Sequence, residues 1–300
     1  MNINFKLLFS DQFRKMLTRI SPKLNTYVTY LIKFHKLLNL NNPKGLNEKI
    51  LWLKFNTYYN NDLIKQCADK YKVRDYIQQI GCKEILNDLI AVYTDIDEIQ
   101  WDKLPNSFVM KLNRGCGFNI IIPDKSKVNS KDVFCKMRKW LKEKPWLPYS
   151  EMQYKDVKPY IIIEKYLQPK HGMLPDDYKF YCFDGVVPYV MVCTDRKEGG
   201  KHPKYWYFDS QWKMQLMTQD AIKYKNQITI PKPEGIEDAF YYARKLSKGF
   251  PFVRVDLYIV DGKVYFGELT FTPSAGMDNG RLKATDLILG EYLILPQANE

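Results

Sequence analysis

The sequence lacks the residue patterns that build zinc sites and disulfide frameworks. Its six cysteines are scattered without a Cys-x-x-Cys pair, and its three histidines form no His-Glu-x-x-His motif. No internal repeat or low-complexity tract is visible. The simplest interpretation is a protein of a reducing cytoplasm that contains no structural zinc.

Long hydrophobic runs are also missing. The N-terminal apolar stretch, residues 1–9, is short and interrupted, and the polar segment 10–15 follows it at once. A signal peptide or a membrane span needs a longer run. We therefore expect that the protein is not exported and is cytoplasmic.

Composition and charge limit the function classes. The 300 residues are 45% hydrophobic and rich in Tyr and Phe, which is enough for a large core and for two or three subdomains around one cleft. The net charge of +12 favours acidic partners: nucleic acid, phospholipid headgroups, nucleotide phosphates or a polyanionic polymer. Because the basic residues are spread along the chain and not clustered on one element, we do not expect a nucleic-acid partner.

Hydrophobic periodicity predicts an α+β fold, with antiparallel pairing dominant in the second half. Residues 10–80 read mostly as helix, including one helix from residue 65 that ends at Gly81. The remaining elements follow in order: strands over 84–93, 107–112 and 118–122, a helix over 130–142, strands over 160–167, 178–183 and 186–192, a helix over 234–248, and a hairpin over 252–273.

The predicted hairpin carries two carboxylates, Asp256 and Glu268, on strands joined at Asp261-Gly262. Asp-Gly between alternating β-branched and aromatic residues is a strong hairpin signal. With a plain two-residue loop the two acids would lie on opposite faces of the sheet. A three-residue loop, or a bulge at Gly267, would bring them onto one face.

On one face, the two acids and the Thr270 hydroxyl would form an all-oxygen site suited to Mg²⁺, which shares its ligands with substrate phosphates. The alternative is a solvated edge hairpin whose acids point outward. The hairpin by itself does not decide between them.

A second candidate site lies in residues 108–118, where a glycine turn joins two apolar strands. Glycines at 115 and 117, on either side of Cys116, let backbone amides approach phosphate oxygens, and Lys111 and Arg114 supply positive charge. The alternative is an ordinary tight turn, and the segment does not match a Walker loop.

A third candidate is the strand end at residues 161–168. Its backbone could bind an adenine ring by one donor and one acceptor, between apolar walls. The alternative is an ordinary strand end with an exposed Glu-Lys pair. The residues concerned are Glu164, Lys165, Tyr166 and Leu167.

The order of these segments resembles the ATP-grasp superfamily over roughly residues 60–275. That resemblance implies ATP and Mg²⁺ as cofactors. Lys111 would hold nucleotide phosphates, the loop Gly115–Gly117 would fold over them, and residues 164–167 would bind adenine. Asp256 and Glu268 would hold the metal. The superfamily usually has asparagine in Glu-x-Asn as a third ligand, where this chain has Thr270.

Residues 41–54, 68–76, 177–185 and 267–271 look more closely like the TupA-like ATP-grasp family of bacterial surface-polysaccharide clusters, nearly end to end. The resemblance implies a ligase that joins an amino acid or amine to a uronic-acid carboxylate through an acyl phosphate, as in teichuronopeptide. It implies four parts: a helical extension (1–60), an N-terminal α/β subdomain (61–104), a lid with the glycine-rich loop (105–165) and a C-terminal subdomain with the metal site (166–300).

The same resemblance suggests further site residues. Lys70, in an Asp-Lys pair, is a candidate for the phosphates, and Asp177 for the ribose hydroxyls. Lys179 and Arg196 are candidates for phosphate or an acidic substrate, or are surface cations. Arg254 lies two residues before Asp256 on the same strand face, and is our first choice for stabilising the substrate carboxylate or the oxyanion.

Two further hypotheses remain open. Asp95-Ile-Asp97 could bind the metal of a sugar nucleotide, which would make the protein a glycosyltransferase of capsule synthesis, although acids at a helix start are a sufficient explanation. The basic, amphipathic stretch 27–40 could place the protein on the inner face of a membrane, although packing on the core is the commoner outcome for such a helix.

Overall fold

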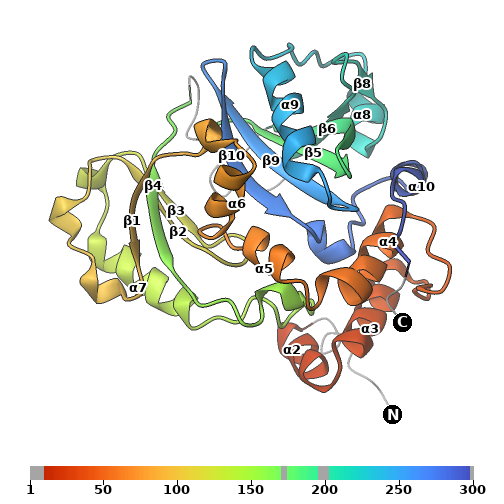
Figure 1. The fold of residues 1–300 in the computed structure, drawn as a ribbon, viewed down its shortest axis with the longest axis horizontal. Coiled ribbons are helices and arrows are strands. Elements are labelled where there is room, and N and C mark those ends of the chain that lie inside the picture. Colours follow the sequence, from red (N-terminus) through yellow and green to blue (C-terminus); the bar gives the residue numbers. More distant parts are fainter. Residues whose placement is uncertain (1–9, 170–173, 195–202, 298–300) are drawn as a thin grey trace.

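The structure is a computed structural model that describes residues 10–169, 174–194 and 203–297. Two antiparallel sheets with surrounding helices confirm the α+β fold (Figure 1). The helices are α2 (Asp11–Ile20), α3 (Pro22–Phe34), α4 (Leu46–Leu53), α5 (Asp62–Ala68), α6 (Val73–Gln79), α7 (Ser130–Leu141), α8 (Gln219–Tyr224), α9 (Ile236–Ser247) and α10 (Lys283–Tyr292). No helix within these ranges is long and apolar enough to cross a membrane.

The smaller sheet has the order β1-β4-β2-β3 and is covered by α7. Its strands are β1 (Leu89–Tyr93), β2 (Phe108–Leu112), β3 (Asn119–Ile122) and β4 (Ile161–Lys165). Alternate residues of β2, Phe108 and Met110, point into a core that also contains Met137 of α7. Because β1 pairs with β4, the expected boundary between residues 104 and 105 falls inside this sheet.

The larger sheet has the order β10-β9-β5-β6-β7-β8. Helix α9 packs against one face, where the rings of Phe180 and Phe240 meet edge to face at 5.0 Å. The sequence patterns did not predict β7, β8 or α8. The strands are β5 (Asp177–Phe183), β6 (Val186–Thr194), β7 (Lys204–Phe208), β8 (Met214–Gln215), β9 (Val253–Val260) and β10 (Lys263–Thr270).

The β9–β10 hairpin has the two-residue turn that Asp-Gly predicts. Lys263 pairs with Val260, and both turn residues have positive φ, 51° at Asp261 and 75° at Gly262. Two left-handed residues are the requirement of a type I′ turn, whose twist matches the strands. The turn alone would therefore leave the two acids on opposite faces.

A β-bulge at Gly267 changes this register. Phe266 pairs with Leu257, but Glu268 pairs directly with Asp256, so one residue of β10 is left over between them. An extra residue reverses the alternation of side chains beyond it. The structure thus confirms that Asp256 and Glu268 share one face, by the second of the two expected routes.

The single helix expected from residue 65 is instead two helices, α5 and α6, separated by a turn at residues 69–72. The carboxylate of Asp69 accepts hydrogen bonds from the backbone N–H groups of Tyr71 (2.8 Å) and Lys72 (3.1 Å). Aspartate competes in this way with helical hydrogen bonding. The break turns Lys70 toward the glycine loop.

The strand expected over residues 84–93 is shorter and less buried than predicted. A 3₁₀ turn occupies Lys83–Ile85, and β1 begins only at Leu89. As an edge strand of the smaller sheet, β1 keeps most of its side chains only partly covered. An apolar run alone does not distinguish an edge strand from a central one.

Helices α2, α3 and α4 hold the segment that links α7 to β4. Thr18 donates to the carbonyl of Leu147 at 2.7 Å, and Asn25 donates to the carbonyl of Pro148 at 3.2 Å. Lys54, at the end of α4, donates to the carbonyl of Tyr149 at 2.6 Å. The N-terminal helices therefore fix the position of this linker relative to both sheets.

We expect the stability contribution of Lys54 to change with pH. Its side chain is buried, and burial lowers its pKa from 10.5 to about 8. Between these two pH values the unfolded chain keeps a proton that the folded chain has lost, so the free energy of unfolding rises with pH. Relative to Lys54→Met, the wild-type protein should gain up to about 3 kcal/mol across this window. Urea unfolding on both sides of the window measures this difference, and an unchanged difference would contradict it.

Candidate active site

Three neighbouring strands bring their charged side chains to one face of the larger sheet. Lys179 of β5 lies opposite Asp256 of β9, which lies opposite Glu268 of β10. Directly opposed residues in paired strands share a face, and so do residues two apart on one strand. The same face therefore also carries Asp177, Arg254 and Thr270, all predicted site residues.

Asp256 lies at the centre of this charged group. Arg254 donates to both of its carboxylate oxygens at 2.7 Å, and Lys179 donates at 2.8 Å. Lys179 also donates to Asp177 at 2.5 Å. Burial raises the pKa of Asp256, and the charges of Arg254 and Lys179 oppose that effect. A buried carboxylate needs such partners because an isolated charge is costly away from water.

Glu268 is the more accessible of the two hairpin acids, with 34% of its side chain exposed. Lys70 lies 3.2 Å from one carboxylate oxygen, and the Thr270 hydroxyl donates to the other at 3.2 Å. Burial acts to raise the pKa of Glu268, but Lys70, Arg254 and Lys179 outweigh it and hold that pKa at about 2. The carboxylate is therefore ionised at neutral pH.

Lys70 connects this group to the glycine loop. Its ammonium donates to the carbonyl of Gly115 at 2.8 Å. Gly115 and Gly117 both have positive φ, 77° and 78°. A Cβ at Gly115 would also meet Pro145 at 2.8 Å, so only glycine fits there. The loop tip, Cys116, is exposed.

A buried pair, Asp69 and Asn113, positions Lys70, and neither residue was predicted from the sequence. The Asn113 side chain donates to Asp69 at 2.7 Å, and the Asn113 carbonyl accepts from the Lys70 backbone N–H at 2.8 Å. Asn113 stands between the predicted residues Lys111 and Arg114. Its role in positioning Lys70 depends on Asp69, which lies 44 positions away in the sequence.

Lys111 and Glu164, predicted for phosphate and adenine, are ion-paired at 2.7 Å. Arg74 of α6, which was not predicted, lies 3.6 Å from the same carboxylate. The backbone N–H of Lys165 donates to the carbonyl of Asp88 at 3.0 Å, so it is not free to donate to an adenine ring. Adenine binding at this strand end stays a prediction.

The structure places Arg114 differently from the prediction of a phosphate ligand. Its guanidinium donates to the carbonyls of Val157 (2.9 Å), Glu143 (3.1 Å) and Leu141 (3.3 Å). It is therefore engaged in tying the glycine loop to the end of α7. Arg196, the other arginine predicted near the substrate, lies outside the described residues.

A further acid, Glu151, adjoins this group and was missed by the sequence analysis. It accepts a hydrogen bond of 2.7 Å from Thr272, the second residue after β10. Gln153 donates to the same hydroxyl at 2.9 Å. These residues come from the irregular linker that the N-terminal helices hold. The only sequence signal was the pair of prolines at 145 and 148, which marks an interruption and not a site.

The residues present fit a magnesium ion. No group of three or more His, Cys, Asp or Glu side chains in the described ranges could hold a metal. Asp256 and Glu268 nevertheless oppose each other with the Thr270 hydroxyl beside them, which is an all-oxygen set. Mg²⁺ is commonly held by one or two carboxylates together with substrate phosphates and water. Its binding here stays a prediction.

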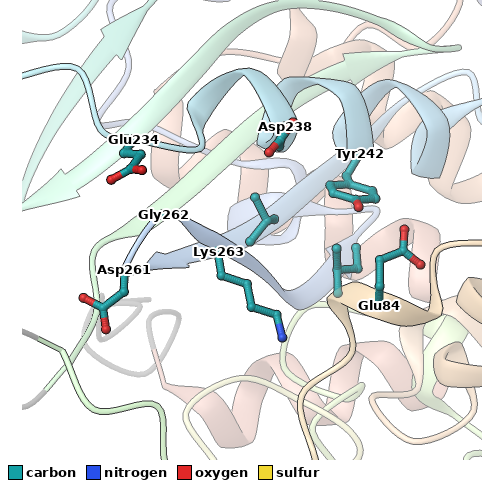
Figure 2. A pocket seen from close by; sticks show the side chains of 9 residues that line it. Glu84, Glu234, Asp238, Tyr242, Asp261, Gly262 and Lys263 are labelled. Atoms are coloured by element: carbon teal, nitrogen blue, oxygen red, sulfur yellow. The ribbon is translucent and has the colours of Figure 1, made fainter.

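A separate hollow of about 430 Å³ lies at the turn end of the same hairpin. Figure 2 shows Glu84, Glu234, Asp238 and Asp261 around it, with Lys263. Four carboxylates and one lysine give this hollow a negative charge. It is therefore unsuited to nucleotide phosphates, unlike the group around Lys70.

Asp95 and Asp97, the motif behind the glycosyltransferase hypothesis, have local structural roles. The Asp95 carboxylate accepts from the backbone N–H of Asp97 at 3.0 Å and caps a 3₁₀ turn. Asp97 is ion-paired with Arg138 of α7. This is the helix-start explanation considered above.

Comparison with known proteins identifies similar structures and a matching family. Among solved structures, D-alanine–D-alanine ligase from Bacillus anthracis in complex with ATP is similar at 17% identity, covering 76% of this chain and 65% of its own, with a TM-score of 0.43. L-amino acid ligase from Bacillus licheniformis is similar at 13% identity, covering 90% and 57%, with a TM-score of 0.44. This chain thus spans less than two thirds of either ligase. No curated protein matches the sequence. The family model described as TupA-like ATPgrasp matches residues 48–294, and the chain therefore belongs to the TupA-like ATP-grasp family.

Proposed function

We propose that the protein is an ATP-dependent ligase that joins a uronic-acid carboxylate of a bacterial surface polysaccharide, or of its precursor, to an amino acid or amine. The observation that carries the proposal is the direct opposition of Asp256 and Glu268 between three cations, Lys70, Lys179 and Arg254. Such a cage suits phosphoryl transfer, which depends on positioning and charge neutralisation. Family membership and the net charge of +12 support an acidic substrate.

Each residue has a role in this reaction. Lys70 and Lys111 would hold nucleotide phosphates under the loop Gly115–Gly117. Lys179 and Arg254 would hold the substrate carboxylate and the charge that develops as its acyl phosphate forms and collapses. Asp256, Glu268 and Thr270 would hold Mg²⁺, which when bound neutralises phosphate charge.

The proposal also covers the step in which the amine reacts and the side of the membrane on which the protein acts. Attack of the amine on the acyl phosphate would form the amide and release phosphate. Because the reaction would consume ATP, the protein would act on the cytoplasmic side of the membrane, where it would meet its saccharide.

The test is ADP release by the purified protein with ATP, Mg²⁺, glucuronate or galacturonate, and mixtures of amino acids. We expect release that requires a uronate and an amine together. Thermal stabilisation by an ATP analogue and by UDP-sugars, measured side by side, separates the ligase from the glycosyltransferase. Failure of Mg²⁺ and ATP to bind would overturn the ligase proposal.

A further inference from the structure

Glu151 differs from the other carboxylates of the site in having no cation. Within 4.0 Å, Glu164 has Lys111, Glu268 has Lys70, and both Asp177 and Asp256 have Lys179. Over the described part of the chain, no lysine or arginine nitrogen lies within that distance of Glu151. Its partner there is the neutral hydroxyl of Thr272, at 2.7 Å.

Glu151 is nevertheless part of the same site. Its side chain is half-buried beside Thr272. Burial raises its pKa, and Lys54, Lys70 and Glu268 lie close enough for their charges to act on it, although neither lysine nitrogen is within 4.0 Å. Cys116, at the tip of the glycine loop, lies close enough to Glu268, Lys70 and Glu151 for their charges to act on it too. A poorly solvated carboxylate with no cation in contact gains most from a cation that a ligand brings.

We propose that Glu151 binds the protonated amine of the amine substrate and accepts its proton before attack. This proposal rests on the proposed ligase function. One proton passes from the ammonium group to the Glu151 carboxylate, and the nitrogen lone pair forms the new C–N bond at the acyl carbon. The C–O bond to phosphate then breaks, and phosphate leaves with the second amine proton.

The chain is built to hold Glu151 in place. Thr18, Asn25 and Lys54 bind the four residues immediately before it through buried and part-buried hydrogen bonds. Thr272 fixes its carboxylate from the end of β10. A residue meant to select and deprotonate an amine must be positioned to within a fraction of an ångström. The N-terminal helices, outside both sheets, would therefore serve the amine site.

Binding tests this directly with Glu151→Gln, which keeps an oxygen to accept from Thr272 and removes only the charge. Melting temperatures are measured with a non-hydrolysable ATP analogue, Mg²⁺ and, in turn, each common amino acid, ethanolamine and their N-acetyl forms. We expect an amine, and not its N-acetyl form, to stabilise the wild-type protein, and Glu151→Gln to lose that shift. Glu143→Gln, on the same linker but paired with Lys15, should keep it. If no amine stabilises the wild-type protein, or if Glu151→Gln responds equally, the proposal is overturned.

Hydroxylamine separates this proposal from the ligase proposal, because it is largely unprotonated at neutral pH and needs no base. With ATP and glucuronate or galacturonate, Glu151→Gln should form hydroxamate at nearly the wild-type rate. Amide formation with the stabilising amine should fall about 100-fold. Equal loss of both products would show a structural role and overturn the amine role. A wild-type protein that forms no hydroxamate counts against the ligase on uronates, and the melting experiment still decides Glu151.

Different observations carry a second proposal, for the outer surface of α2 and α3. Five large apolar side chains are exposed there, by 38% to 67%, at intervals of four, four, three and four residues: Met16, Ile20, Leu24, Tyr27 and Leu31. Residues 10–40 contain six lysines and arginines and one acid. Figure 1 shows these two helices at one end of the molecule, away from both sheets.

We also propose that this surface lies on an anionic lipid bilayer. An exposed apolar row with basic flanks is the pattern of an interfacial helix, in which apolar burial and attraction to anionic lipid act together. Co-sedimentation at low salt with phosphatidylglycerol vesicles should capture the wild-type protein, and vesicles of phosphatidylcholine alone should not. Ile20→Ser with Leu31→Ser should weaken capture about tenfold, because each change removes a buried apolar group. Ile222→Ser, on α8 and about as exposed as Leu31, should not weaken capture. No capture, or equal capture of all variants, would overturn this proposal.

Discussion

Glu268→Gln is expected to lower ATP turnover at least about 100-fold while the protein stays folded. The amide would keep the side-chain volume and an oxygen that accepts from Thr270. It would lose the negative charge that lies across from Asp256 on the paired strand. Because a third of this side chain is exposed, water can solvate Lys70 after the change, and the loss of stability should be small. ADP release and thermal unfolding measure the two effects.

The sharper measurement is the dependence of nucleotide binding on Mg²⁺. In the wild-type protein, Mg²⁺ should tighten the binding of a non-hydrolysable ATP analogue, and Glu268→Gln should abolish most of that gain. Asp95→Asn is the matched control, since Asp95 is an exposed acid that caps a turn of the smaller sheet. A Glu268→Gln protein that keeps the full effect of Mg²⁺ would show that this carboxylate is not a metal ligand.

Gly267→Ala is expected to cost about 1–3 kcal/mol of stability and to reduce turnover as well. A Cβ at this position would lie 2.8 Å from the backbone carbonyl oxygen of Asp256 and 3.2 Å from the ring of Tyr258. The oxygen belongs to the paired strand and cannot move without changing the ladder. The bulge must therefore shift, and Glu268, the next residue, would turn away from Asp256.

Gly280→Ala is the control for this change, because a Cβ there meets nothing closer than 3.4 Å, the Asp278 carboxylate. It should leave both stability and turnover nearly unchanged. Thermal unfolding and ADP release are measured on both variants. Wild-type turnover in Gly267→Ala would show that the bulge does not position Glu268.

Much of the hairpin follows from its sequence. Asp261-Gly262 specifies the turn, since both residues accept the positive φ that the turn requires. Val264 and Leu269 are both buried in one core although they lie an odd number of residues apart, which a regular strand forbids. Their burial, which only the structure shows, requires a bulge between them, and Gly267 is the residue in that stretch that lacks a side chain.

The local sequence around the glycine loop was less informative. Arg114 stands beside the loop and carries the charge that a phosphate needs, yet it binds the carbonyls of residues 141, 143 and 157. The residues next to Arg114 in the sequence would be the same whether its guanidinium bound a phosphate or backbone carbonyls. Only the packing of α7 against the loop distinguishes them.

The α+β class, the hairpin with its turn, and the shared face of Arg254 and Asp256 all follow from the sequence, because they depend on neighbours a few positions apart. The tertiary structure alone decided how the two sheets meet. It joined Lys70 to Gly115, and Glu151 to Thr272 across 121 positions. Contacts of that range are selected by the packing of whole elements, which no short pattern encodes. The acids of the hairpin, with Arg254 on the strand of Asp256, are thus readable from the chain, but the contacts that bring Lys70 and Lys179 to them are not.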